Sequence, residues 1–366
     1  GAEDACGVCQ ALCEPQAIDF AQQDEILELD VGMIIIATGF ADFDPRLTPQ
    51  YSYGKSRNIL TGMEFERLSN ASGPTSGQIF TAEGVPPKSV AILHCVGSRD
   101  EHTNKHCSRV CCMYAMKQAH LVREKTGAEV FEFYMDIRAF GKGYEEFYER
   151  VQEEGVHFIR GKGAEVTVRE DGKLVVKGED ADLGRIVNVV VDMVILGTGF
   201  TPQPDAAKVG HLFGLGCGSE GFFTEAHPKL RPVETNTDGV FLAGACQAPR
   251  DIPDTVAHAN AAAAEALALL SRGEVTISPT TAFVDEELCS GCKTCIELCP
   301  YTALMFVVED GKGHARVNEA LCKGCGTCAA ACPSKAITAR HFTDAQILAQ
   351  IEGLFQVREA EKVMGG

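Results

Sequence analysis

The sequence has no run of about 18 or more apolar residues, and therefore no candidate for a membrane-spanning helix. Its longest apolar stretches, VVVDMVILG and AAAAEALALL, have the lengths of a buried strand and a buried helix. The opening residues, GAEDACGVC, contain no basic segment followed by an apolar one, so no secretion signal is visible. We therefore expect a cytoplasmic protein without a transmembrane segment.

Positive charge is also scarce. The formal net charge is −18 at pH 7, and the acidic residues are spread over the whole chain. Because a nucleic-acid-binding protein needs a basic face for the phosphates, we expect no nucleic-acid partner. The length of 366 residues and the apolar share of 45% indicate a globular chain of two or three domains.

Cysteine, in contrast, is abundant, with 17 residues. All of them except Cys217 and Cys246 fall into four groups along the chain. In a protein without a secretion signal, such spacing indicates metal binding rather than disulfide bonds.

Two of these groups are the segments CSGCKTCIELCP and CKGCGTCAAACP. Both have the spacing C-x2-C-x2-C-x3-C-P of bacterial ferredoxins, in which the fourth cysteine of each run binds the other [4Fe–4S] cluster. One cluster is therefore expected to bind Cys289, Cys292, Cys295 and Cys332, and the other Cys322, Cys325, Cys328 and Cys299. A zinc ribbon is the alternative, but a structural zinc site uses four thiolates rather than eight in this spacing.

A third group, at the start of the sequence, matches the last three cysteines of such a run. It contains Cys6, Cys9 and Cys13, with Glu3 at the first position. Either Glu3 replaces a cysteine ligand, or the chain begins inside a longer ferredoxin insert. In both cases a complete site needs cysteines from upstream, so we expect part of one or two further clusters here.

The fourth group lies in HCVGSRDEHTNKHCSRVCC and contains Cys95, Cys107, Cys111 and Cys112, called the Cys95 group below. We expect a helix to begin near Ser108, with Cys107 and Cys111 on one face and Cys95 at the end of the preceding strand. A helix N-terminus there would favour an anionic cluster. From the spacing alone, buried free cysteines and a redox dithiol at Cys111–Cys112 remain alternatives to a metal cluster.

Strands and helices alternate between these groups, which predicts a parallel sheet covered by helices. Residues 26–40 and 185–200 are similar apolar strands that end in a Thr-Gly-Phe turn, and 89–97 and 128–137 are strands on either side of a helix near 108–125. Residues 235–253 form a turn, a strand and a glycine-containing loop, and the helix ANAAAAEALALL follows. The one match to the phosphate-binding pattern G-x-G-x-x-G, from Gly216 to Gly221, follows no strand and is interpreted as chance.

This order resembles the flavoprotein family with two dinucleotide domains that includes thioredoxin and disulfide reductases. The resemblance implies an α/β fold of that type with a C-terminal α+β two-cluster ferredoxin domain. It also implies FAD contacts at Thr38, Gly39, Gly244, Ala245, Asp251, Ile252 and Pro253. Ala245 and Cys246 follow Gly244 where that family has an aspartate, so the resemblance does not extend to the family's usual ribitol contact.

Longer motifs carry a more specific resemblance. HCVGSRD, HCSRVCCMYAMKQA, FYMDIRAFGKGYEEFYERVQEEGVHFIRG, GFFTEAHPKLRPVETNTDGVFLAG and LCKGCGTCAAACPSKAI are similar to the A-type subunits of heterodisulfide reductase, from about residue 4 to 355. The resemblance implies that the Cys95 group holds an unusual [4Fe–4S] cluster beside FAD, and that Lys117 lies near the flavin ring. It also implies that the family's N-terminal part, with the flavin fingerprint and the first half of an inserted ferredoxin, lies outside this sequence.

The resulting domain prediction has six parts. They are a remnant of an inserted ferredoxin (1–25), an FAD-domain segment with a crossover (26–88), an NAD-like domain with the Cys95 group (89–200), the C-terminal part of the FAD domain (201–275), a two-cluster ferredoxin domain (276–340), and a helix with a tail (341–366). Thr343 and Gln346 are expected to cap that last helix. Its apolar stripe either packs on its own ferredoxin domain or docks another subunit; the stripe consists of Ile347, Leu348, Ile351, Leu354 and Phe355.

The function implied by the resemblance is electron transfer within a heterodisulfide-reductase-like complex. A flavin would take two electrons from a donor and pass one to ferredoxin and one to a high-potential acceptor, such as a CoM–CoB disulfide. The implied partners are disulfide-reducing B and C type subunits, a hydrogenase or formate dehydrogenase linker subunit, and ferredoxin, in a dimer of the complex.

Two other functions stay open. One is a non-catalytic iron–sulfur wiring subunit of a benzoyl-CoA-reductase-like or quinone-interacting complex, and the other is an NAD(P)H reductase. The NAD(P)H reductase would need a phosphate fingerprint near residue 95, which the sequence lacks. The isolated histidines His94, His106, His227 and His258 are interpreted as packed or hydrogen-bonded residues rather than ligands.

Overall fold

The computed structural model describes residues 7–274, 279–309 and 311–364, with the side chains of the last helix described as far as Phe355. Its contacts divide the chain into two units, Gly1–Gly32 and Met33–Gly366. In the first unit, the described residues form one short helix, α1 (Val8–Ala11). None of the helices in the described ranges is long and apolar enough to span a membrane.

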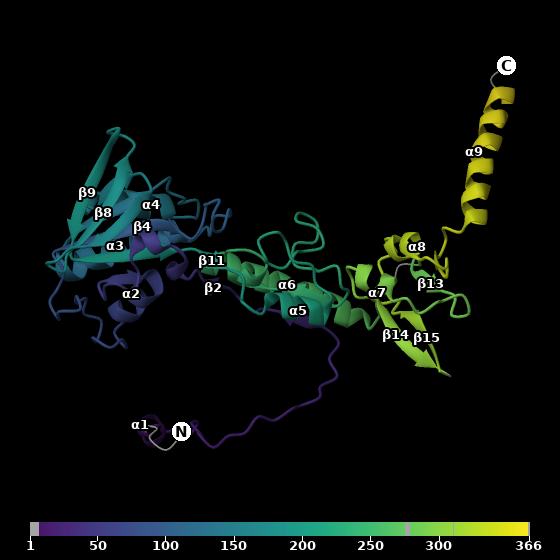
Figure 1. Ribbon diagram of the computed structural model, residues 1–366, viewed down its shortest axis with the longest axis horizontal. Coiled ribbons are helices and arrows are strands. Elements are labelled where there is room, and N and C mark those ends of the chain that lie inside the picture. Colours follow the sequence, from purple (N-terminus) through teal and green to yellow (C-terminus); the bar gives the residue numbers. More distant parts are fainter. Residues whose placement is uncertain (1–6, 275–278, 310, 365–366) are drawn as a thin grey trace. The chain divides into compact units, whose positions relative to one another are not determined.

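A five-stranded parallel sheet organises the second unit (Figure 1). Its strand order is β3 (Ile59–Thr61), β10 (Met193–Thr198), β4 (Ser89–Val96), β5 (Glu129–Tyr134) and β6 (His157–Arg160). The central strand β4 reads as a nearly continuous apolar run because both of its faces are buried. Val90 and Ile92 face one layer, whereas Ala91 and Leu93 face the other.

Helices cover one face of this sheet. They are α2 (Gly62–Ser69), α3 (Cys111–Thr126) and α4 (Tyr144–Glu153). Phe65 of α2, Met116 of α3 and Val151 of α4 are fully buried against the sheet. Thr61 and Glu64 form a reciprocal capping box that fixes the start of α2.

A three-stranded antiparallel sheet covers the other face. It consists of β7 (Gly163–Val168), β8 (Leu174–Asp180) and β9 (Arg185–Val191), and its inward residues Val166, Leu174 and Val176 pack against β4 and β5. Asp192 separates β9 from β10, and its carboxylate accepts hydrogen bonds from the backbone N–H groups of Lys88 and Ser89 at the start of β4.

Segments that lie before and after the five-stranded sheet in the sequence form a second packed part of the fold. The strand β1 (Ile34–Ile36) pairs in parallel with β12 (Val240–Leu242), and β2 (Ala41–Asp42) pairs antiparallel with β11 (Phe200–Thr201). The helices here are α5 (Ala206–Phe213), α6 (Ile252–Arg272) and the 3-10 helices η2 (Pro45–Leu47), η3 (Pro49–Tyr51) and η4 (Gly244–Cys246). Phe223, Leu242 and Cys246 are buried in its core.

The described residues of 279–364 form two antiparallel strand pairs and three helices. The pairs are β13 (Ala282–Val284) with β16 (Ile337–Ala339), and β14 (Leu304–Glu309) with β15 (Lys312–Val317). The helices are α7 (Thr294–Leu298), α8 (Thr327–Ala331) and α9 (Asp344–Met364), and α7 contacts α8. The side chains of Thr343 and Gln346 cap α9 reciprocally, as predicted.

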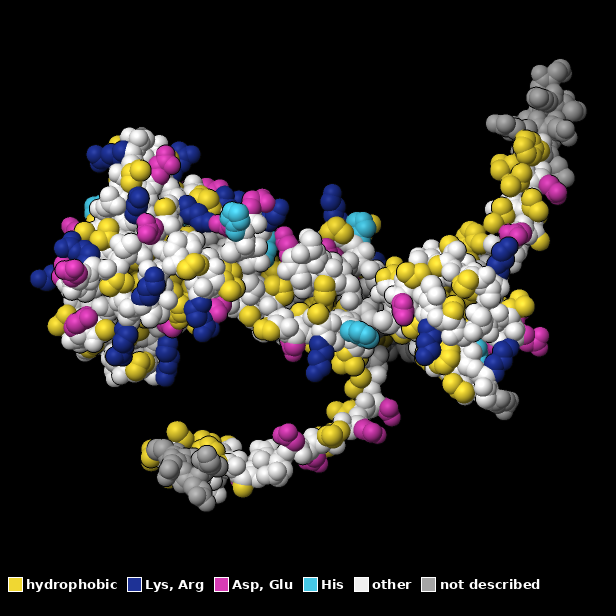
Figure 2. Space-filling view, in the orientation of Figure 1, with side chains coloured by type: hydrophobic (Ala, Val, Ile, Leu, Met, Phe, Trp, Pro, Cys, Tyr) yellow, Lys and Arg dark blue, Asp and Glu magenta, His cyan; other side chains and the backbone are white. Residues whose placement is uncertain are grey.

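The apolar stripe on α9 is not covered by the ferredoxin domain. Ile347, Leu348 and Ile351 are between 41% and 58% exposed, and Leu354 and Phe355 are 69% and 63% exposed. Figure 2 shows hydrophobic side chains along this helix. The prediction that the stripe packs on its own ferredoxin domain is therefore wrong for the described side chains.

Several predicted element bounds were also wrong. The strand expected over 26–40 is limited to Ile34–Ile36, because Ile26 and Leu29 before it are 93% and 76% exposed and pair with no strand among the described residues. The strand expected over 185–200 divides at Asp192, since β9 belongs to the antiparallel sheet and β10 to the parallel one. The helix α6 begins at Ile252, well before ANAAAAEALALL, because Asp251 caps it.

The predicted start of α3 was wrong as well. The helix begins at Cys111 rather than near Ser108, because Arg109 has a φ of 60° and so interrupts a right-handed helix. Cys107 therefore lies in the preceding loop and not on the helix face of Cys111.

Candidate functional site

The cysteines of the two ferredoxin runs line two cavities in residues 279–340. One cavity is lined by Cys289, Cys292, Cys295 and Cys332, and the other by Cys299, Cys322, Cys325 and Cys328. Each set contains three cysteines from one run and the fourth from the other run. This is the exchange of fourth cysteines that the spacing predicts for a pair of [4Fe–4S] clusters.

Backbone geometry explains why glycine stands beside these cysteines. Gly291 and Gly324 have φ values of 72° and 63°, and a Cβ on Gly324 would collide with the backbone oxygen of Thr280. The backbone N–H of Ala282 donates to Cys322 Sγ at 3.3 Å, and that of Ala303 donates to Cys299 Sγ at 3.3 Å. Such N–H groups stabilise anionic sulfur ligands, so the loops fit clusters.

The described cysteine sulfurs do not converge as closely as the ligands of one bound zinc ion do. In a tetrahedral site with zinc–sulfur bonds of about 2.3 Å, the sulfurs are roughly 3.8 Å apart. Among the described residues, no three cysteine sulfurs lie within 4.8 Å of one another.

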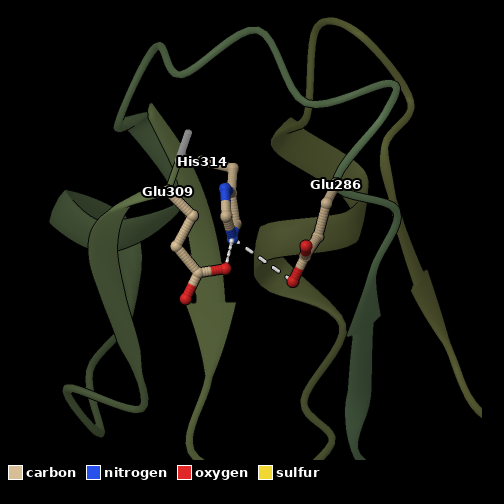
Figure 3. Close-up of side chains that lie close together, drawn as sticks. All are labelled: Glu286, Glu309 and His314. Atoms are coloured by element: carbon tan, nitrogen blue, oxygen red, sulfur yellow. Dashed lines mark ion pairs between the residues drawn. The ribbon is translucent and has the colours of Figure 1, made fainter. Parts of the chain in front are cut away.

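One other group of metal-ligating side chains occurs in the ferredoxin domain. Glu286, Glu309 and His314 converge, with the buried His314 between the two exposed carboxylates (Figure 3). Arg316 already supplies a cation there, because its guanidinium lies 2.7 Å from Glu309 and 3.5 Å from Glu286. We therefore interpret this group as an ion-pair network.

The Cys95 group lies where β4 ends and α3 begins. Cys95, Cys111 and Cys112 are 4% to 5% exposed, and Cys107 is half-buried. Cys95 has a φ of 58°, which turns the chain at the strand end, and Cys111 and Cys112 occupy the first turn of α3. The apolar Val110 is the N-cap residue, and no described side chain caps this helix end. Three elements thus bring the four cysteines to one place.

Burial raises the pKa of Cys95 to about 11, and the neighbouring Cys112 adds to this increase. Burial also raises the pKa of Cys111 strongly, with further contributions from Cys95 and Cys112. These thiols influence one another electrostatically, so they are close in space. Without a metal, Cys95 and Cys111 keep their protons at neutral pH, and metal binding would release them.

Two basic residues face the same thiols. Burial alone would lower the pKa of His94, but the neighbouring Cys112 and Glu132 outweigh it and raise the pKa to about 10. Burial opposes ionisation of Cys112, yet the neighbouring His94 lowers its pKa. Arg99 lies beside Cys95 and pairs with Asp136. The Cys95 group therefore has positive partners, which suits an anionic cluster.

The two Thr-Gly-Phe turns meet beside this group. The rings of Phe40 and Phe200 stack with their centroids 3.5 Å apart, and the backbone N–H of Phe43 donates to Gly199 O at 2.9 Å. Cys111 Sγ lies 3.7 Å from Thr198 O, which also accepts from the Tyr114 hydroxyl at 2.6 Å. Of the predicted flavin contacts, Thr38 and Gly39 precede Phe40, and Gly39 has a φ of 71° with open space around it.

The other predicted flavin contacts lie between β12 and α6. Gly244 has a φ of 74°, and its N–H donates to the buried His258 at 3.0 Å, while Ala245 is buried beside it. Asp251 caps α6 by accepting from the N–H of Asp254 at 2.9 Å, and it also accepts from the Tyr144 hydroxyl at 3.0 Å. Ile252 and Pro253 are exposed in the first turn of α6. The N-terminal end of α6 is therefore exposed.

Arg109 connects the N-terminal end of α6 to the loop of the Cys95 group. It stands between Cys107 and Cys111 in the chain, and its guanidinium lies 2.8 Å from Asp254 Oδ2 and 3.5 Å from Pro249 O. The same guanidinium lies 5.1 Å from the centre of the Phe140 ring. The sequence does not predict this link, because nothing around an isolated arginine indicates its distant partner.

Lys117 is half exposed on α3, and its ammonium lies 2.7 Å from Glu66 on α2. Its place near a flavin ring stays a prediction. In the first unit, Cys9 is exposed and Cys13 accepts a hydrogen bond from the N–H of Ala17 at 3.3 Å, whereas Cys6 lies outside the described residues.

The four isolated histidines are packed or hydrogen-bonded, as predicted. His94 contacts Glu132, His106 contacts Phe200 O at 2.8 Å, and His258 contacts Gly244. His227 accepts from the backbone N–H groups of the turn that follows it. The Glu132 partner of His94 was missed, although a lone glutamate inside the apolar strand VFEFY was a signal for a buried ion pair.

Comparison with known proteins identifies two domains. Residues 110–266 match the family of pyridine nucleotide-disulphide oxidoreductases, and residues 282–339 match the 4Fe–4S dicluster domain. A thioredoxin reductase structure from T. acidophilum covers 66% of this chain and 66% of its own, with 15% identity and a TM-score of 0.43. The two domain matches confirm the predicted fold class and the predicted cofactor types, [4Fe–4S] clusters and FAD.

Curated relatives that match most of this chain identify its family more specifically than the two domain matches do. The A-type subunit of the H2:CoB–CoM heterodisulfide,ferredoxin reductase from Methanothermobacter thermautotrophicus is 52% identical over 95% of this chain and 53% of its own length. An A-type iron–sulfur subunit of the CoB–CoM heterodisulfide reductase from Methanopyrus kandleri is 52% identical over 94% and 53%. The A-type subunit of the ferredoxin:CoB–CoM heterodisulfide reductase from Methanosarcina mazei is 45% identical over 94% and 44%.

The chain thus spans about half the length of the curated relatives it matches. The chain belongs to the family of heterodisulfide reductase A-type subunits, as an iron–sulfur flavoprotein of the oxidoreductase class.

Proposed function

We propose that this chain transfers electrons in a complex that reduces a CoB–CoM type disulfide and ferredoxin. The relative from Methanothermobacter thermautotrophicus is named as a subunit of a reductase for the CoB–CoM heterodisulfide and ferredoxin, and the relative from Methanosarcina mazei as a subunit of a ferredoxin:CoB–CoM heterodisulfide reductase. The observation that carries the proposal is the Arg109 link, because it joins the loop of the Cys95 group to the 249–254 segment within one chain. A cluster held by the first would thus lie next to a flavin held by the second.

The residues of the chain divide the task. The Cys95 group would hold the cluster nearest the flavin, and the two cavities of the ferredoxin domain would hold the clusters of an exit path. Gly39 and Gly244, both with positive φ, leave the backbone free of side chains where a flavin would lie. Bound FAD supplies the conversion between two-electron and one-electron transfer. Lys117 would then contribute a positive charge near the flavin ring.

The finer proposal is bifurcation, in which two electrons from one donor separate. One electron goes to ferredoxin at low potential, and the other goes to the disulfide at high potential. Two two-electron donors therefore reduce two one-electron ferredoxin equivalents and one disulfide, since the disulfide needs two electrons. The second electron path keeps the reaction favourable overall, because the exergonic transfer compensates the endergonic one.

The experiment measures coupling in the anaerobically purified complex that contains this chain. Ferredoxin reduction is followed with a two-electron donor, first with and then without the CoB–CoM disulfide. Bifurcation predicts that ferredoxin is reduced only when the disulfide is present, with two one-electron equivalents per disulfide. Ferredoxin reduction at the same rate without the disulfide would contradict bifurcation but not electron transfer.

The runner-up function is an iron–sulfur wiring subunit without flavin. It is favoured by Ala245 and Cys246, which stand where related flavoproteins have an aspartate. Flavin content decides between the two functions: about one FAD for each chain in the purified complex supports the first, and none supports the second.

The proposed partners of this chain are disulfide-reducing B and C type subunits, a hydrogenase or formate dehydrogenase linker subunit, and ferredoxin, in a dimeric complex. The apolar stripe on α9 is the proposed docking surface for one of these partners, since its described side chains are exposed.

A further inference from the structure

The two halves of the ferredoxin domain repeat one local structure. The Cys289 cavity is the one lined by Cys289, Cys292, Cys295 and Cys332, and the Cys322 cavity is the other. After the fourth cysteine of each run, the chain passes a proline and then reaches a residue with positive φ, Thr302 at 47° and Lys335 at 55°. Each donates its backbone N–H to the oxygen of the fourth cysteine of its own run, at 3.3 and 3.2 Å. Residues beside one cavity therefore have equivalents beside the other.

The Cys322 cavity has one side against other residues of this chain. Lys323 lines that cavity, and its ammonium lies 2.7 Å from Asp238 in the turn before β12. Thr302 is close to Gly214 at the end of α5, where an added Cβ would lie 3.0 Å from its hydroxyl. Asp238 thus balances the charge of the lysine at this cavity.

The equivalent positions at the Cys289 cavity are exposed. Lys335, the equivalent of Thr302, is exposed, and so is Lys293, the equivalent of Gly326. The Lys293 ammonium lies 4.4 Å from the centre of the Phe306 ring, which lines the same cavity. Neither lysine has a carboxylate within ion-pair distance among the described side chains. Two cations without counter-charges therefore flank the Cys289 cavity.

The backbone at Lys293 is strained. Its φ is 65°, a value that glycine adopts freely and that a side chain disfavours. The equivalent Gly326 has a φ of 77° with open space around it, so the fold itself needs no side chain at this position. A lysine retained in spite of such strain indicates a function for its charge.

We propose that Lys293 and Lys335 form the docking site for a small acidic one-electron carrier protein, which approaches the Cys289 cavity while the Cys322 cavity faces the rest of the chain. The proposal rests on the proposed function, because it assumes that the domain binds clusters and passes electrons to ferredoxin. In each encounter one electron leaves this chain and the carrier is reduced by one electron, with no transfer of a proton.

Charge is the reason for the choice of partner. The chain as a whole carries a net charge of −18, so an acidic carrier is repelled by most of its surface. The exposed lysines would steer the carrier to one face and orient it there. Cys292 is exposed beside Lys293, so the electron would have a short path to a carrier bound at this face.

The test measures binding of a purified 2[4Fe–4S] ferredoxin of net negative charge to the anaerobically purified complex that contains this chain. The test variant combines Lys293→Glu with Lys335→Glu, and the conservative variant combines Lys293→Arg with Lys335→Arg. The matched control combines Lys55→Glu with Lys208→Glu, because these lysines are exposed outside the ferredoxin domain and give the same change in net charge. Iron content is measured in each protein.

We expect the test variant to bind ferredoxin on the order of tenfold more weakly than wild type at low ionic strength. The difference should shrink at about 1 M salt, where charges more than about 3 Å apart are screened. The control and the arginine variant should keep the wild-type affinity. An unchanged affinity in the test variant with its iron retained, or an equal loss in the control, would overturn the proposal.

A further variant keeps the test decisive if the glutamate protein loses iron. Lys293→Gln with Lys335→Gln removes both charges without adding new ones, and weaker binding with iron retained supports the proposal. An unchanged affinity of this variant overturns it.

Cross-linking locates the contact directly. A carbodiimide joins a lysine amine to a carboxylate with loss of water, so wild-type protein should be linked to ferredoxin at Lys293 or Lys335. Links to ferredoxin only at other lysines, or links from these two lysines to another subunit instead, would overturn the proposal. Binding and cross-linking need no electron flow, whereas a complex without the roughly eight irons of the ferredoxin domain would overturn the proposed function itself.

Discussion

Arg109 offers the most direct way to separate stability from electron transfer. Its ion pair with Asp254 is 35% and 45% exposed at the two side chains, so we expect it to stabilise the fold by only about 0.2–1 kcal/mol. Its contact with the Phe140 ring adds about 0.5 kcal/mol at an exposed site. Arg109→Ala should therefore lower the free energy of unfolding by about 1 kcal/mol and leave the iron content unchanged.

The functional effect of the same change should be larger. Because Arg109 holds the 249–254 segment against the loop of the Cys95 group, Arg109→Ala should lower the flavin retained after gel filtration and slow reduction of that cluster by the flavin. Small displacements at a reacting site cost more than the lost contacts, often about 100-fold in rate.

The assay combines anaerobic denaturant unfolding, flavin content and stopped-flow reduction of the clusters. Arg109→Gly is the matched variant, since glycine relieves the positive φ of 60° at this position and isolates the side-chain effect from backbone strain. Both variants should lose flavin to the same extent. Full flavin content and unchanged cluster reduction in both would refute the idea that Arg109 couples the two sites.

Three further predictions test the rest of the structure. Lys173 and the backbone N–H groups of Lys88 and Ser89 overcome burial and hold the pKa of Asp192 below its usual value. The ionised Asp192 therefore stabilises the fold above about pH 4, and this contribution is lost as the pH falls toward the lowered pKa. Asp192→Asn should lower the free energy of unfolding by about 1.5–3 kcal/mol at neutral pH, and in unfolding measurements the difference from wild type should shrink below about pH 4. In Gly324→Ala the new Cβ would meet the Thr280 backbone oxygen, so this variant should lose about four irons per chain. The control Gly326→Ala, at a φ of 77° in open space, should retain its iron. Equal iron content in the two variants would contradict the steric argument. On α9, the double variant Leu348→Asp with Leu354→Asp should no longer co-purify with the partner subunits, although its iron content stays intact. The control Gln350→Asp on the same helix should have no effect. Partner subunits that still co-purify with the double variant would exclude α9 as a docking surface.

The sequence predicts the parts of this protein that depend on local pattern. The spacing of the ferredoxin runs predicted which four cysteines would share each cavity, because that exchange is fixed by the chain path. The strand β4 and the capped helix α9 were likewise predictable from an apolar run and a capping pair. In each case the signal lies within a short segment.

What the sequence did not predict depends on distant partners or on unusual backbone angles. The φ of 60° at Arg109 moved the start of α3 by three residues and took Cys107 off the helix. The division of residues 185–200 at Asp192 follows from hydrogen bonds to the start of β4, about a hundred residues earlier. The pair of His94 with Glu132 needs the register of two parallel strands, which no local pattern gives.

The central claim, a third complete cluster at the Cys95 group, is tested most directly by iron content. Iron per chain is measured in anaerobically purified protein, with and without Cys111→Ser plus Cys112→Ser. Cys246→Ser is the matched control, because Cys246 is equally buried at 3% exposure and belongs to no cysteine group. The account predicts a loss of about four irons in the double variant and none in the control. Unchanged iron in a folded double variant would contradict the cluster and leave these thiols as buried or redox-active cysteines.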